Sequence, residues 1–263
     1  MKRKAWVLYT ALGVGSALSL SGCASGKYLQ LTPVTGDVAH VEGRMVTKAE
    51  ADSLVVVASF EREDMEYLAM DIEIKNRSSR PMRIDPTRFR YVALTANEDT
   101  LRESHNPALA VARTAADPTA ESERVKTKVA REERRLKTAR IINTVLLVAA
   151  VASDVSSSTR RQSVESRFRN RVAHNNAYQL IQAKRVIDHG VFADRMQQYG
   201  FEAYRWNELA LQRTYIEPGE SVRGFVYLPK ANAAQFIRLN YPVSEQGEVS
   251  LVFSQEMVAR KRK

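Results

Sequence analysis

Residues 67–76, YLAMDIEIKN, decide the fold of this chain of 263 residues. The stretch begins apolar and then alternates apolar and polar side chains from Met70 to Lys75. Such alternation places one set of side chains in a core and the other in water, as in an antiparallel strand. The polar residues 76–80 and Pro81 then form a turn signal. The stretch therefore predicts a β-strand with one wet face.

Other short strand patterns flank this stretch, and turn residues separate them. Pro86 lies in one such turn, and residues 218–220, Pro-Gly-Glu, form another. About eight short strands with turns at short intervals are typical of a β-sandwich. We expect the sandwich to comprise residues 38–96 and 212–256. The other predicted strands are 53–60, 82–85, 89–94, 214–216, 222–228, 235–240 and 248–253.

Residues 97–211 lack strand patterning and are rich in helix formers. A first helix is predicted over 120–152, where Ala, Glu, Arg and Lys precede an apolar run. Two more helices are predicted over 160–186 and 191–199, the last ended by Gly200. The sequence therefore predicts a mainly β protein whose sandwich is interrupted by a long helical hairpin.

Three short motifs in the strand regions carry a family resemblance. They are Ile-x-Ile-x-Asn at 72–76, Ile-Asp-Pro at 84–86, and Pro-Gly-Glu at 218–220 before a strand. Their order resembles the immunoglobulin-like domains of bacterial lipoproteins. The resemblance implies an immunoglobulin-like antiparallel β-sandwich. The partners of that family are mostly unknown, so the resemblance supports the fold more than the function. It carries over no catalytic residue.

The amino terminus has the pattern of an export signal. Met-Lys-Arg-Lys precedes an apolar run at 5–20, and small residues follow it. The sequence Leu-Ser-Gly-Cys, ending in Gly22 and Cys23, resembles the lipobox of bacterial lipoproteins. The resemblance implies cleavage between these two residues, a diacylglycerol on the Cys23 thiol, and acylation of the new amine. Ala24 in the next position resembles an outer-membrane address, on the periplasmic side.

These features predict a signal peptide at 1–22, a lipidated stem at 23–37 and a basic tail at 257–263. Several acyl chains on Cys23 would anchor the protein stably, whereas one chain would hold it only marginally. A transmembrane anchor or an ordinary cleaved signal are the alternatives. The apolar run is shorter than the roughly 20 residues that span a bilayer.

The positive charge of the chain is local. The net charge is +10, and residues 121–171 hold thirteen Lys or Arg against six Asp or Glu. Arg131, Arg134 and Arg135 lie in the most basic part of this segment. We expect a solvated helix face here or, as the functional alternative, contact with an anionic partner such as lipid headgroups or lipopolysaccharide.

The apolar run at 141–152, with Leu146 and Leu147 at its centre, is apolar around a whole helix circumference. It is about 18 Å long as a helix, too short to cross a bilayer. Two interpretations remain open. The run packs against the sandwich or the second helix, or it self-associates or contacts lipid.

Sequence signals for enzyme chemistry are weak. The four histidines are scattered, and the chain has neither a phosphate-binding glycine loop nor a nucleophile elbow. Cys23 is the only cysteine, so neither a disulfide within the chain nor a cysteine-based metal site can form. We expect no catalytic site, metal or cofactor, and neither nucleic acid nor nucleotide as a partner.

The aromatic residues Tyr199, Phe201, Tyr204 and Trp206 lie where the insertion returns to the sandwich. They predict core packing or a ligand site that stacks on aromatic rings. The sequence as a whole favours a non-catalytic, lipid-anchored envelope protein that acts as an interaction or structural module through its helical insertion. The alternatives are a binder of carbohydrate or anionic lipid, and a hydrolase with a carboxylate pair formed only in three dimensions.

Overall fold

The computed structural model describes residues 27–259, except for 42, 159–162 and 246. The predicted signal at 1–22, Gly22 and Cys23 lie outside the described residues, as do residues 260–263 of the predicted tail.

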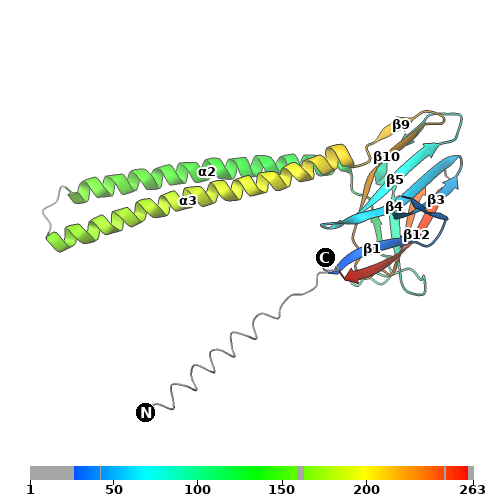
Figure 1. Ribbon diagram of the computed structural model, residues 1–263, viewed down its shortest axis with the longest axis horizontal. Helices are drawn as coiled ribbons and strands as arrows, with labels where there is room; N and C mark the ends of the chain where they lie inside the picture. Colours follow the sequence, from blue (N-terminus) through cyan, green and yellow to red (C-terminus); the bar gives the residue numbers. More distant parts are fainter. Residues whose placement is uncertain (1–26, 42, 159–162, 246, 260–263) are drawn as a thin grey trace, which may run out of the picture.

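Two five-stranded antiparallel sheets form the body of the protein (Figure 1). The first has the order β1-β12-β11-β7-β8 and the second β10-β5-β4-β3-β2, and β6 pairs with β9 beside them. The strands of the first sheet are β1 (Lys27–Pro33), β7 (Arg90–Leu94), β8 (Ala112–Thr114), β11 (Phe236–Pro242) and β12 (Glu248–Ala259). Those of the second are β2 (Asp37–Val41), β3 (Arg44–Ala51), β4 (Leu54–Asp64), β5 (Tyr67–Asn76) and β10 (Ser221–Pro229). The short elements are β6 (Met82–Ile84), the 3₁₀ turn η2 (Pro86–Arg88) and β9 (Thr214–Ile216).

Strand β5 supplies the centre of the hydrophobic core. Leu68, Met70, Ile72 and Ile74 alternate along it and are fully buried. They belong to one core cluster with residues of the other sheet, such as Leu239 of β11. Full burial of one such side chain contributes about 1.5–3 kcal/mol. The alternation of β5 therefore joins the two sheets through a shared core.

The outward-facing side chains of β5 are more buried than the sequence predicted. Tyr67, Ala69 and Asp71 are at most 9 % exposed, and only Lys75 at the far end is exposed among its outward residues. The base of the helical insertion covers Tyr67 and Ala69, whereas arginine side chains cover Asp71. The prediction of one wet face is therefore wrong for most of the strand.

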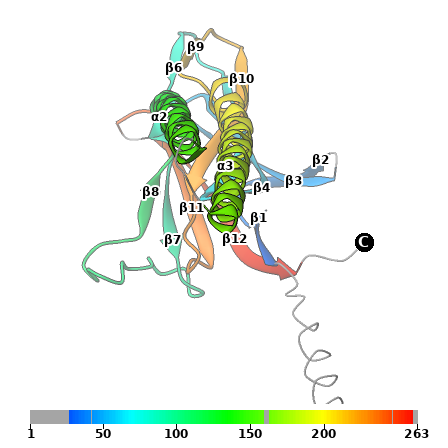
Figure 2. The same cartoon turned by 90° about the vertical axis from the view of Figure 1, so that its left-hand side faces the viewer.

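Two long helices form the predicted hairpin, which projects from the sheets (Figures 1 and 2). Helix α2 (Pro118–Ser158) and helix α3 (Val164–Tyr204) have 41 residues each, so each is about 60 Å long. The second helix continues through Gly190 and Gly200, where the sequence predicted a gap and an end. A glycine in a helix costs only about 1 kcal/mol, and the long α2 surface beside α3 outweighs that cost.

The boundaries of the parts differ from the predicted ones. Strand β1 pairs with β12 along its whole length, and its Leu29 and Leu31 are buried, so the predicted stem at 23–37 contains a core strand. The helical insertion was predicted to begin at residue 97, but α2 begins only at Pro118. Residues 97–117 instead contain β8, which pairs with β7 of the first sheet. At the other end, β12 extends to Ala259 into the predicted tail.

Candidate interaction surface on the helical hairpin

The base of the hairpin is anchored by Trp206 in the short π-helix η3 (Arg205–Leu209). Trp206 is 3 % exposed, and its ring contacts Tyr67 edge-on at 5.5 Å and Tyr227 at 4.8 Å between centroids. Phe201 and Tyr204, in contrast, are both 52 % exposed. The four predicted aromatic residues therefore do not form one site. Burial of Trp206 argues against a stacking site for sugars there.

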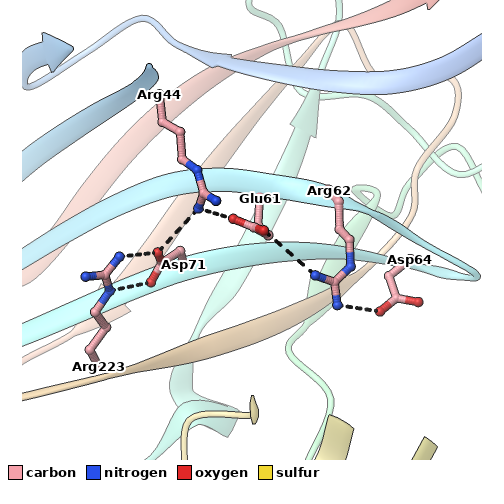
Figure 3. A network of polar contacts seen from close by, with 6 residues as sticks. All are labelled: Arg44, Glu61, Arg62, Asp64, Asp71 and Arg223. Carbon is pink, nitrogen blue, oxygen red and sulfur yellow. Dashed lines mark hydrogen bonds and ion pairs between the residues drawn. The ribbon is translucent and has the colours of Figure 1, made fainter. Parts of the chain in front are cut away.

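A buried ion pair fixes the base to the second sheet. Arg205 Nη2 lies 2.7 Å from Asp64 Oδ1, and the two side chains are 3 % and 9 % exposed. Figure 3 shows how Asp64 continues into a chain of contacts on the outer face of this sheet. Arg62 links Asp64 to Glu61, Arg44 links Glu61 to Asp71, and Arg223 holds Asp71 through two hydrogen bonds. The network ties the hairpin base to four neighbouring strands, β3, β4, β5 and β10.

The seam between the two helices is polar at three levels. Arg195 Nη1 lies 2.8 Å from Glu132 Oε2, and His174 Nδ1 lies 3.3 Å from Asp154 Oδ1. Between these levels, Asn143 Nδ2 donates to Asp188 Oδ2 at 3.0 Å. The three α2 residues are eleven positions apart, which is three helical turns, so they lie on one face of α2.

Hydrogen bonds hold two carboxylates of the seam, those of Glu132 and Asp188, in the charged state. The hydrogen bond from Arg195 lowers the pKa of Glu132, and Arg135 adds a second. The hydrogen bond from Lys184 lowers the pKa of Asp188, and Asn143 supports it. Apolar side chains are buried in the seam at Leu136 and Ile181. The seam therefore combines polar contacts with buried apolar side chains.

This seam turns the apolar run of α2 outward. Of the interpretations open from the sequence, burial against the second helix is wrong for most of the run. Seven large apolar side chains of α2 are 43–65 % exposed, namely Ile141, Ile142, Val145, Leu146, Val148, Val151 and Val155. Because Asn143 and Asp154 occupy the seam, these residues must lie on the remaining circumference.

The predicted contact residues fall into two groups. Arg131, Arg134 and Arg135 are exposed and line one open groove of about 660 Å³, together with Ile142 and Lys184. Sequence reasoning missed Lys184, because its place opposite the α2 arginines depends on how the helices pair.

Leu146 and Leu147 are adjacent in sequence but have different surroundings. Leu146 is 43 % exposed, whereas Leu147 is half-buried and lines a cavity of about 510 Å³ between the helices. Only Leu146 can therefore contact a partner without disturbing the hairpin.

By length and composition alone, α2 is also apolar enough to cross a membrane. An 18-residue window of this helix has a mean hydropathy of 1.5, and 6 % of the window is buried in the protein. The apolar part of α2 is therefore longer than the predicted run at 141–152. That run alone is too short to span a bilayer.

Within the described parts of the chain, no three His, Cys, Asp or Glu side chains gather in an arrangement that could hold a metal ion. A scan against models of protein families finds no match to this sequence, and comparisons with curated proteins and with solved structures find none either.

Proposed function

We propose that this chain is a non-catalytic, lipid-anchored protein of the cell envelope whose helical hairpin binds another envelope component. The exposed apolar run of α2 is the observation that supports this proposal most strongly. Soluble monomers rarely expose large contiguous apolar surface, and such surface marks sites of contact with proteins or membranes. The run lies on an element that projects away from the sheets, where a partner can reach it (Figure 1).

The anchor in this proposal is Cys23, on the basis of its lipobox resemblance. Strand β1 begins at Lys27, four residues later. At no more than about 3.5 Å per residue, Lys27 lies within roughly 14 Å of the lipidated residue. The acyl chains would therefore hold the first sheet close to the bilayer. We place the anchor in the outer membrane on the periplasmic side, because Ala24 follows Cys23.

We further propose that the sheet body is an immunoglobulin-like sandwich. Two antiparallel sheets with a shared core of alternating inward side chains support this proposal. In this account the body serves as the support that carries the hairpin.

A crosslinked pull-down from intact envelopes tests the proposed function. We expect the wild type to capture a crosslinked protein or lipid and a deletion of residues 121–171 to capture neither. Leu146→Asp should abolish capture while the protein stays folded, because Leu146 is exposed. Gln182→Asp, at an exposed polar position of α3, is the matched control and should capture normally. Equal capture by all four chains would contradict a role of the hairpin.

The anchor needs a separate measurement, which is the mass of the amino-terminal peptide from purified envelopes. We expect a peptide that begins at Cys23 and carries acyl groups. An unmodified Cys23 would refute the lipid anchor and leave the hairpin result unaffected.

A further inference from the structure

One face of the hairpin combines cations with exposed apolar side chains. Residues 131, 135, 142 and 146 of α2 are spaced by four or seven positions, so they lie on one side of the helix. On α3, residues 184 and 187 lie three apart on one side. The groove that contains Arg131, Arg135, Ile142 and Lys184 joins these two sides. We name as the basic–apolar face Arg131, Arg135, Ile142, Leu146, Lys184 and Ile187.

The apolar members of this face are open to solvent. Ile142 is 47 %, Leu146 43 % and Ile187 63 % exposed. Leu180, four residues before Lys184 and thus on the same side of α3, is 71 % exposed. The face therefore presents an apolar strip along both helices.

The charge of this face is positive. No acidic side chain lines the groove, and Arg131 and Arg134 form no ion pair with any described residue. Lys184 and Arg135 form ion pairs with Asp188 and Glu132. These two acidic side chains lie in the seam and do not line the groove. A partner that binds this face has to accept cations beside an apolar strip.

We infer that the basic–apolar face binds the surface of an anionic lipid bilayer, with the hairpin lying in the plane of the interface. This inference rests on the proposed function and names the partner of the hairpin. A helix with an apolar side and cations beside it buries the apolar side at the acyl boundary and keeps the cations among the headgroups. The apolar strip of this face would contact the acyl boundary, and the cations of the groove would lie among the headgroups.

The hairpin lies flat in this inference because α3 cannot follow α2 across a bilayer. His174 contacts Ser153 and Asp154, so the polar part of α3 lies beside the apolar run. Crossing would carry Arg171 and Arg185 of α3 into the hydrocarbon layer, and each costs about 2.5–3.5 kcal/mol there. Lying flat with the basic–apolar face downward leaves these residues in water.

Charge also favours lipid over a second copy of the chain. Residues 121–171 hold thirteen basic and six acidic residues, so two hairpins would bring like charges together. Anionic headgroups neutralise the same charges, at about 1 kcal/mol for each basic residue near the surface.

A probe on a single introduced cysteine tests the inference, because lipid occupies the thiol of Cys23 in the proposed function. The full chain is reconstituted in vesicles of phosphatidylcholine with increasing phosphatidylglycerol. An environment-sensitive fluorophore is placed at Leu180→Cys, on the same side of α3 as Lys184 of the basic–apolar face, or at Gln182→Cys on the other side of α3. We expect phosphatidylglycerol to shift the emission of the first probe to the blue and to leave the second unchanged.

Charge variants with matched net charge complete the experiment. Arg131→Gln with Lys184→Gln should lower the ratio of docked to free probe by about 25-fold, since each lost contact is worth roughly fivefold. Arg171→Gln with Arg185→Gln removes the same charge from the other side and should change the ratio little.

Three results would overturn the inference. They are the same emission with and without phosphatidylglycerol, equal effects of the two charge variants, and a shift that follows protein density and gives crosslinked dimers. The last result would assign the face to a second copy. A normal pull-down alongside any of them would leave the proposed function standing. Uptake of the fluorophore by the wild type would instead expose a free Cys23 and contradict only the anchor.

Discussion

Arg205, at the end of the hairpin, donates a hydrogen bond of 2.7 Å to Asp64, at the end of β4, and both side chains are almost fully buried. The guanidinium carbon also lies 5.8 Å from the centres of the Trp206 and Tyr227 rings. At the hairpin base, Arg205 thus combines an ion pair to the sheet with contacts to two aromatic rings. This joint links the hairpin base to the second sheet.

Removal of one partner from this pair should destabilise the protein strongly. We expect Asp64→Asn to lower the free energy of unfolding by about 3–5 kcal/mol, since it leaves the Arg205 charge buried and unpaired. Glu50→Gln breaks the exposed pair with Arg77 and should cost at most about 1 kcal/mol. Urea unfolding followed by circular dichroism measures both. Similar costs for the two variants would contradict a structural role for the joint.

Two glycines should respond in opposite directions to alanine. A Cβ at Gly224 would lie 2.7 Å from Leu211 Cα, so Gly224→Ala forces the backbones apart and should cost about 1–3 kcal/mol. Gly190 lies inside α3 with nothing within 4 Å of such a Cβ. Gly190→Ala should therefore stabilise the helix by up to about 1 kcal/mol. Thermal unfolding distinguishes the signs, and a loss of stability in Gly190→Ala would argue against a continuous α3.

The polar side chain of Asn143 in the seam should lower the stability of the hairpin. Asn143 is 5 % exposed, and its Oδ1 has no hydrogen-bond partner among the described residues. Asn143→Leu should raise the free energy of unfolding by about 1 kcal/mol, because it removes an unsatisfied buried acceptor. Leu147→Asn makes the reverse change four residues later and should lower it. Chemical unfolding tests the pair, and destabilisation by Asn143→Leu would show that the amide contributes more than it costs.

Acid should loosen the hairpin through its seam. The pKa of Glu132 is lowered in the folded state by the hydrogen bond from Arg195, from an ordinary value of 4.5. A carboxylate with a lowered folded pKa contributes stability above its unfolded pKa, and this stability is lost as pH falls through the folded value. Melting temperatures should therefore fall below about pH 4.5 more steeply in the wild type than in Glu132→Gln. Superimposable pH profiles would mean that this ion pair adds no stability.

Sequence patterns predicted the helical hairpin and eight strands, including the short pair β6 and β9, but missed β1, β2, β3 and β8. Alternation in 67–76 and the helix formers after residue 118 were sufficient for β5 and the hairpin. Strand β1 escaped prediction because its partner β12 lies at the other end of the chain. The joint between Asp64 and Arg205 spans 141 residues and has no local signal.

The candidate surface was predicted only in part, for a related reason. The arginines at 131–135 and Leu146 were identified from charge and apolarity. Their orientation depends on the seam between the helices. Polar residues eleven positions apart define this seam, and a search for apolar stripes does not detect such a pattern. Lys184 and Ile187 join the face only through the pairing of α2 with α3.

Photocrosslinking from Leu146 in intact cells tests the central claim most directly. A photoreactive amino acid replaces Leu146 on the basic–apolar face or Gln182 on the other side of the hairpin. The account predicts lipid-derived or protein adducts from position 146 and few from position 182. Equal adducts from both positions, or none from position 146 in a folded and exported protein, would contradict the claim that this face is the contact surface.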